Sequence, residues 1–129
     1  MTFRFARHTN NLEQIKSFYI DVLGLKLLGG FENHNGYDGL FIGKPNENWH
    51  LEFTQSDTET NSTFDDNDIL VFYPNNKLEY DVILEKLKSH AVAFIKAKNP
   101  YWNDPEISGG IMFLDPDGFR IVISNLKIV

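Results

Sequence analysis

The two halves of the chain repeat one order of elements, and this repeat restricts the fold more than any other feature of the sequence. Asn-Asn-Leu-Glu at 10–13 and Asn-Asn-Lys-Leu-Glu at 75–79 each lie between a short strand-like segment and an amphipathic segment. Asparagine is a preferred residue at helix N-caps, so both motifs predict the start of a helix. Each half then continues with further segments typical of strands. Repetition at this scale indicates two copies of one βαβββ unit.

In the first half, strands are expected on both sides of one helix. They are predicted over residues 3–9, 25–31, 37–43 and 48–54. In the first of them, we expect Phe3 and Phe5 to face the core. The helix begins at a cap formed by Asn10 or Asn11 and ends at Gly24, because glycine tolerates the left-handed conformation there. Its buried stripe consists of apolar residues at helical spacing: Leu12, Ile15, Tyr19 and Val22.

The second half has the same organisation. Strands are predicted over residues 68–73, 92–95, 110–114 and 119–124. The helix after Asn75 and Asn76 has a stripe of Tyr80, Ile83, Leu84 and Leu87. Asp-Pro-Asp-Gly at 115–118 is a strong turn signal between the last two strands. A long loop is expected over 99–105.

These elements predict an α+β fold in a single domain. Module one covers about residues 1–55, a polar linker about 56–67, and module two about 68–129. We expect a curved mixed sheet around a cleft, with the helices on its outer face. If Phe5, Leu51, Ile69 and Ile121 face the helices, the alternate residues line the cleft. The predicted lining is Arg4, Ala6, His8, His50, Glu52, Thr54, Asp68, Leu70, Phe72, Arg120, Val122 and Ser124.

Composition excludes several classes of protein. The chain has 129 residues and no cysteine, so disulfides and thiolate ligands are excluded. Its net charge is −6, and it has no basic cluster to neutralise nucleic-acid phosphates. No apolar run approaches the roughly 20 residues that span a bilayer, and the N-terminus lacks the apolar core of a signal peptide. We therefore expect a cytoplasmic protein without nucleic-acid or membrane partners.

Three motifs together resemble the vicinal oxygen chelate superfamily. They are the helix sequence at 12–25, Leu-Glu-Phe-Thr at 51–54, and Asp-Pro-Asp-Gly at 115–118. The superfamily includes glyoxalase I, extradiol dioxygenases, and fosfomycin- and bleomycin-resistance proteins. Asn-Pro-Tyr-Trp at 99–102 is similar to a poorly characterised branch of it. The resemblance implies paired βαβββ modules, a cleft for a small molecule and a homodimer, but not one particular reaction.

Metal-binding members of the superfamily place one ligand on the first strand and one on the last strand of each module. Matched to this sequence, those positions hold Arg4, Glu52, Asp68 and Val122. Valine has no donor atom, and arginine carries a permanent positive charge that repels a cation. We therefore hypothesise that Arg4 pairs with Glu52 and Asp68 and is itself the cation of the site.

The candidate site residues follow from these arguments. His50 and Glu52, two residues apart on one strand face, are the candidates for acid–base catalysis. Tyr101 and Trp102 either line a pocket or hold their loop to the fold. The predicted ligand-binding residues are Arg4, His8, His50, Glu52, Asp68, Phe72, Trp102 and Phe113. If a divalent metal is present, its expected ligands are His8, His50 and Glu52.

The sequence is compatible with three functions. The favoured one is binding of a small organic molecule without a metal or other cofactor, as in bleomycin-binding proteins. The second is an enzyme: a lyase, isomerase or dioxygenase that uses a divalent metal and an irregular ligand set, or a metal-free enzyme with His50 or Glu52 as base. The third is an interaction module whose cleft has lost its function.

Overall fold

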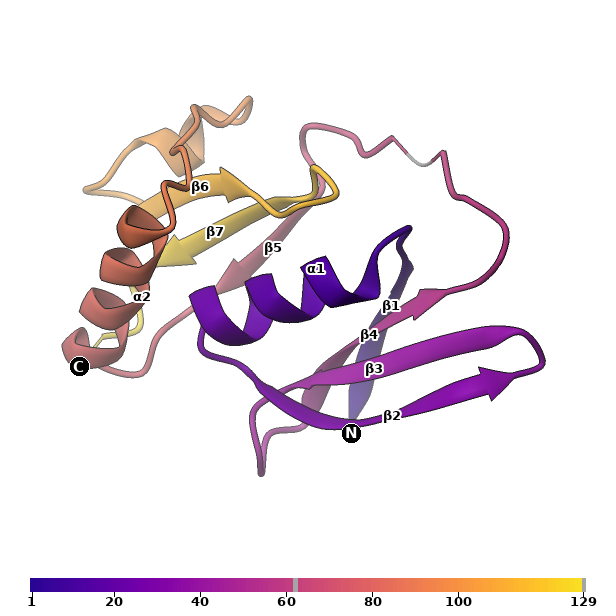
Figure 1. Cartoon of the computed structure of the whole chain (residues 1–129). Coiled ribbons are helices and arrows are strands. Elements are labelled where there is room, and N and C mark those ends of the chain that lie inside the picture. Colours follow the sequence, from indigo (N-terminus) through magenta and orange to yellow (C-terminus); the bar gives the residue numbers. More distant parts are fainter. Residues whose placement is uncertain (62, 129) are drawn as a thin grey trace. The chain divides into compact units, whose positions relative to one another are not determined.

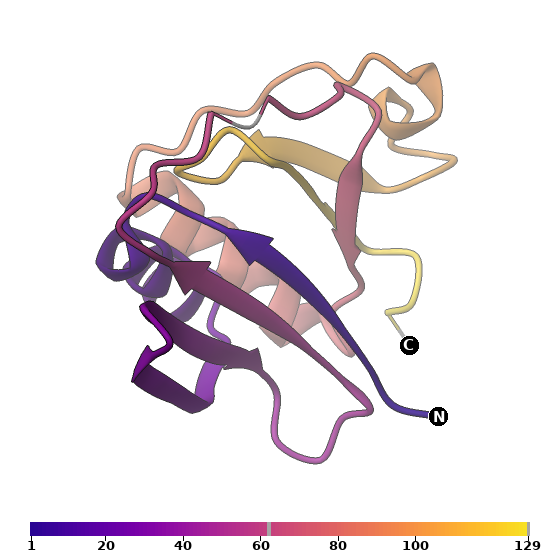
Figure 2. The ribbon, with the colours of Figure 1, turned by 90° about the vertical axis from the view of Figure 1, so that its right-hand side faces the viewer.

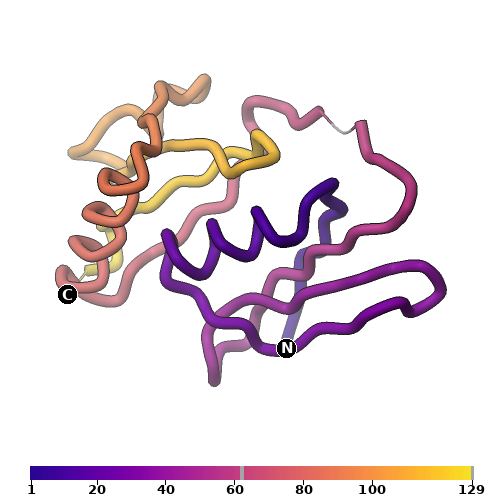
Figure 3. The backbone as a smooth tube through the Cα atoms, in the orientation of Figure 1, coloured from indigo at the N-terminus to yellow at the C-terminus, as the bar shows by residue number. Residues whose placement is uncertain are grey.

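A computed structural model describes residues 1–61 and 63–128, so Ser62 of the predicted linker and Val129 lie outside the described residues. The fold is α+β, with two compact units, Met1–Ser62 and Thr63–Val129. Figure 1 labels the elements and Figure 3 follows the backbone through them. The first unit contains β1 (Phe3–His8), α1 (Leu12–Ser17), η1 (Phe18–Val22), β2 (Lys26–His34), β3 (Tyr37–Gly43) and β4 (Trp49–Gln55). The second contains β5 (Ile69–Phe72), α2 (Lys77–Ser89), η2 (Pro100–Asn103), β6 (Gly110–Leu114) and β7 (Arg120–Ser124).

The first unit is built on a mixed four-stranded sheet in the order β1-β4-β3-β2. β1 and β4 are parallel, and they run side by side in Figure 2, whereas the other neighbours are antiparallel. β2 and β3 are joined by a two-residue turn at Asn35 and Gly36, with φ of 53° and 87°. Positive φ at both positions is the requirement of the tight hairpin turn that Asn-Gly favours. β2 is therefore longer than the sequence predicts.

The first helix forms as predicted and continues as a wider π-helical turn. Asn11 caps it, because its side chain accepts a hydrogen bond of 3.0 Å from the backbone N–H of Gln14. The predicted stripe is buried, with Ile15 and Tyr19 fully so. Gly24 follows with φ of 76°, as expected for a residue that ends a helix.

The packing of β1 corrects one prediction. Phe3 and Phe5 are 64% and 37% exposed, so they are not core residues. Phe5 is in register with Leu51 of β4, which is buried. The difference arises because α1 packs on β3 and β4, whereas β1 is the edge strand of the sheet. The predicted face of Phe5 is therefore right, but the helix does not cover it.

The second unit is built on a three-stranded sheet in the order β5-β7-β6, with β5 parallel to β7 and β6 antiparallel to it. The predicted turn between β6 and β7 is present. The Asp115 carboxylate accepts from the backbone N–H of Asp117 at 2.9 Å and of Phe119 at 3.0 Å. Gly118 adopts φ of 85°, which favours glycine.

The strand predicted over 92–95 is wrong, because only Ile95 forms a bridge, with Met112. The end of α2 explains the difference. Ala91 adopts φ of 55°, and the backbone N–H of Val92 donates to the carbonyl of Leu87 at 2.9 Å. This 6→1 bond is typical of a helix C-terminal cap, so the amide of Val92 is used by the helix and not by a sheet.

The face assignment of β5 also needs correction. Ile69 is in register with Arg120, and Val71 with Val122. Leu70 and Phe72 therefore lie on the opposite face from Val122, not on the same one as predicted. The segment Ile-Leu-Val-Phe has no polar residue to mark a face, and all its residues are half-buried.

The described parts of the predicted linker are held to the unit on their own side. Asn10 exchanges two hydrogen bonds with the backbone of Thr60, at 3.0 and 2.8 Å. On the other side, Asp66 forms an ion pair with Arg120 at 2.9 Å. Both segments therefore carry ordered contacts.

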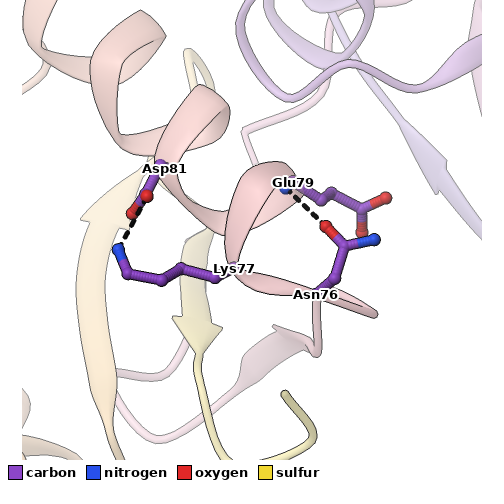
Figure 4. A network of polar contacts seen from close by, with 4 residues as sticks. All are labelled: Asn76, Lys77, Glu79 and Asp81. Carbon is purple, nitrogen blue, oxygen red and sulfur yellow. Dashed lines mark hydrogen bonds and ion pairs between the residues drawn. The ribbon is translucent and has the colours of Figure 1, made fainter. Parts of the chain in front are cut away.

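The N-terminus of α2 is organised by short polar contacts (Figure 4). The Asn76 side chain accepts from the backbone N–H of Glu79 at 2.8 Å, and Lys77 pairs with Asp81 at 2.7 Å. Ile83 and Leu87 of the predicted stripe are buried, while Tyr80 and Leu84 are half-buried. Among the residues that the structure describes, no helix is long and apolar enough to cross a membrane.

We predict that Asn76→Ala lowers the free energy of unfolding by about 1 kcal/mol, because the helix loses its side-chain cap. Asn75→Ala is the matched control, since Asn75 contacts Glu79 through its backbone N–H, which alanine keeps. The control is expected to stay within about 0.5 kcal/mol of wild type. Urea unfolding followed by circular dichroism measures both. Equal losses in the two variants would show that the cap is not the cause.

Candidate functional site

One face of the four-stranded sheet collects polar and aromatic side chains. In the register of β1 with β4, Arg4 lies beside His50, Ala6 beside Glu52 and His8 beside Thr54. In the register of β3 with β4, Phe41 lies beside Glu52. Residues in register point to the same side of a sheet. The helix packs on the other side, where Tyr19 contacts Phe53.

The ion pair that the sequence predicts between Arg4 and Glu52 is present. Nη1 of Arg4 lies 2.6 Å from Oε1 of Glu52, a charge-assisted hydrogen bond. The Arg4 side chain is 52% exposed and that of Glu52 only 14%. The guanidinium also lies 5.1 Å from the centre of the Phe41 ring, within the range of a cation–π contact. Glu52 and Phe41 together hold the guanidinium at the surface of the sheet.

The aromatic contacts continue from Phe41 in two directions. Its ring centre lies 5.6 Å from that of His50, edge to face, and 5.9 Å from that of Phe31. Phe31 in turn lies 6.1 Å from His34. We call Arg4, Phe31, Phe41, His50 and Glu52 the aromatic face. Its three rings are half-buried, so they are partly open to solvent.

Gly39 makes room for this arrangement. It is in register with Phe31, and a Cβ atom at Gly39 would overlap the Phe31 ring. The ring therefore lies across the backbone of β3, where any larger residue would displace it.

His8 lies on the same side of the sheet but makes separate contacts. Its Nδ1 lies 2.8 Å from Oγ1 of Thr54, and its Nε2 lies 3.3 Å from Oγ of Ser56. Its ring also meets that of Tyr37 edge to face at 5.8 Å. Because Thr54 lies four residues beyond His50 on β4, His8 is separated from His50 by about 13 Å of strand. His8, His50 and Glu52 thus do not converge as a metal site, and no group of three possible ligands occurs among residues 1–61 and 63–128.

The residues at the superfamily's metal positions do not fit a divalent cation. Arg4 offers only donors and a positive charge. Val122 is fully buried with Ala97 and Met112 in an apolar cluster of the second unit. Asp68 is exposed, and the carboxylate that pairs with Arg120 belongs to Asp66. Two of the four positions, Arg4 and Val122, therefore have no atom that can coordinate a metal, and the remaining donors do not form a usual ligand set.

The remaining predicted ligand-binding residues belong to the second unit and are buried or half-buried: Phe72, Trp102 and Phe113. Trp102 packs against the cluster around Val122. Its loop is held by Asn103, whose side chain bonds both the N–H and the carbonyl of Ala97 at 2.7 Å. Phe113 is fully buried, and Phe72 is half-buried on β5. Trp102 therefore packs on the core of its unit, and its part in ligand binding stays a prediction.

The aromatic side chains that β2 and β3 contribute to this face were not predicted from the sequence. The face of Phe41 could be predicted, because Leu40 and Ile42 alternate with Gly39, Phe41 and Gly43 along β3. The extent of this strand is predicted correctly. Phe31 has no such signal, because register shifts interrupt the pairing of β2 with β3 on either side of it.

We predict that Gly39→Ala lowers the free energy of unfolding by about 1–3 kcal/mol, because the added methyl group displaces the Phe31 ring. The same change in a Phe31→Ala background should cost much less, since the overlap is gone. A double-mutant cycle by urea unfolding measures the coupling. An equal cost in both backgrounds would mean that the ring does not lie on Gly39.

Several solved structures share this fold. Glyoxalase I of Leishmania major, described as trypanothione-dependent, has a TM-score of 0.75 at 20% identity, with 98% of this chain and 87% of that chain covered. TnmS3, an antibiotic binding protein from Streptomyces sp. CB03234, has a TM-score of 0.68 at 21% identity, with 97% and 94% covered. At this level of identity the similarity concerns the fold, which is that of the vicinal oxygen chelate superfamily.

A much nearer relative is YycE of Bacillus subtilis, an uncharacterised protein. It is 42% identical over 125 residues, which are 96% of this chain and 87% of that protein. A crystal structure of a YycE protein of unknown function from that organism has a TM-score of 0.85 at 41% identity, with 99% of this chain and 91% of that chain covered. The sequence matches the YycE-like N-terminal domain over residues 3–54 and the YycE-like C-terminal domain over residues 63–125. The chain therefore belongs to the YycE-like family, and its fold is that of the vicinal oxygen chelate superfamily.

Proposed function

We propose that the chain binds a small organic molecule on the aromatic face, without a metal ion. The observation that carries the proposal is the Arg4–Glu52 pair, in which a guanidinium stands at a position where chelating relatives have a ligand. Two of the four matched residues, Arg4 and Glu52, lie in the first unit, and only Glu52 has a donor oxygen. Its carboxylate is already bonded to the Arg4 guanidinium.

The aromatic side chains support an organic ligand. Phe31, Phe41 and His50 form consecutive ring contacts and are each partly exposed. Ligand sites of small molecules are lined mostly by apolar and aromatic groups, with a few polar groups that fix orientation. Here Arg4 and Glu52 supply the polar groups. TnmS3, which has the same fold, is an antibiotic binding protein.

The proposal is tested with 2-naphthamide, a neutral aromatic probe, in protein treated with a chelator. We expect binding with a dissociation constant of about 1 mM or below, and NMR shifts centred on the amides of Phe41, His50 and Glu52. Phe41→Leu should weaken binding about fivefold, because one aromatic contact is worth roughly 1 kcal/mol.

Phe5→Leu is the matched control, since Phe5 lies on the opposite face of the same sheet. It should leave probe affinity unchanged. Shifts confined to other residues, or equal losses in both variants, would refute the proposed location. If chelator-treated protein binds nothing and zinc, manganese or nickel restores binding, the metal-dependent alternative is right.

A further inference from the structure

We propose that the ligand of the aromatic face is a planar aromatic compound with an anionic oxygen, such as an aromatic carboxylate or phenolate. This inference rests on the proposed function and adds the chemical class of the ligand. Two observations support it. The Arg4 side chain is more exposed to solvent than that of Glu52, and aromatic rings lie beside this ion pair.

The solvent-facing charge of the ion pair is positive. Glu52 is largely covered, while about half of the Arg4 side chain is open, at 14% and 52% exposure. A molecule that reaches the sheet from solvent therefore meets the guanidinium first and the carboxylate behind it. The bond to Glu52 uses one N–H group of Nη1, and a guanidinium has five N–H donors in a planar fork. Donors of this geometry match the two oxygens of a carboxylate.

The guanidinium is also held in place before a ligand arrives. Glu52 binds it from one side at 2.6 Å, and the Phe41 ring lies 5.1 Å away. Fixing a flexible arginine in advance reduces the entropy lost on binding. Glu52 therefore acts as the group that positions Arg4.

The rings define the rest of the ligand. Phe41 contacts both Arg4 and Phe31, so a ring surface extends from the guanidinium along β3 toward β2. An aromatic acid can place its ring against Phe31 and Phe41 while its oxygens accept from Arg4. An aliphatic anion would use only the charge, and a neutral aromatic compound only the rings.

The test compares 2-naphthoate with 2-naphthamide, two probes of nearly equal shape that differ in charge. At about 0.15 M salt, where charges beyond roughly 8 Å are screened, wild-type protein should bind naphthoate about tenfold more tightly, as expected for a charge-assisted hydrogen bond to a half-exposed group. The comparison needs no substitution, so it does not depend on the folding of a variant. Isothermal titration or NMR measures both constants.

The double variant Arg4→Gln/Glu52→Gln then removes the guanidinium without leaving Glu52 as an uncompensated carboxylate. It should lose the preference for naphthoate, so that the two probes bind it with equal dissociation constants. Lys77→Gln/Asp81→Asn is the charge-matched control, because it removes another exposed ion pair and likewise leaves the net charge unchanged. It should change neither dissociation constant. Arg4→Lys should keep only part of the preference, because it retains the charge but not the planar fork.

The outcomes separate this inference from the proposed function. If both probes bind equally, or the double variant keeps the preference, the anionic class is wrong while ligand binding at the aromatic face stands. If neither probe binds, the proposed function fails, and this inference fails with it. Tighter naphthoate binding that the double variant abolishes supports both.

Discussion

The parallel pairing of β1 with β4 is the constraint on which the first unit depends. These strands come from opposite ends of the unit, and α1 with the β2–β3 hairpin connects them. A parallel pair needs such a long connection, whereas an antiparallel pair needs only a short turn. The pairing fixes the register of Arg4 beside His50 and of Ala6 beside Glu52. The ion pair follows from this register, because Arg4 and Glu52 are then diagonal neighbours on one face.

Stability alone does not explain the Arg4–Glu52 pair. Exposed ion pairs contribute about 0–1 kcal/mol, and the Arg4 side chain is half-exposed. Its Glu52 partner is largely covered, and a covered carboxylate without a partner is costly. The arginine therefore compensates for a carboxylate that the fold places on the sheet. The same contact leaves an oriented guanidinium at the surface, beside Phe41, and this consequence links the packing of the unit to its proposed function.

Local chemistry made much of the fold predictable. Asn11 and Asn76 cap their helices as expected, because cap formation depends on a few neighbouring residues. The turn at 115–118 is predictable for the same reason. The Arg4–Glu52 pair could be predicted because β4 alternates clearly between apolar and polar residues, as β1 does from Phe3 to Phe5. The superfamily resemblance also relates the positions of Arg4 and Glu52.

The failures arise where the sequence carries no local signal or where tertiary structure decides. The face of β5 was assigned wrongly because four consecutive apolar residues do not distinguish two faces. Phe5 remains exposed because the helix packs on other strands. The place of Phe31 depends on an interrupted strand register and on the space above Gly39. In all three cases the observed position depends on pairing or packing with elements that are distant in the sequence.

We propose that the guanidinium of Arg4 replaces a metal ion beside Glu52. The most direct test is elemental analysis of the purified protein, before and after incubation with zinc, manganese and nickel followed by desalting. The account predicts that no ion is retained in stoichiometric amount under either condition. One ion per chain that is lost in Glu52→Gln would contradict it.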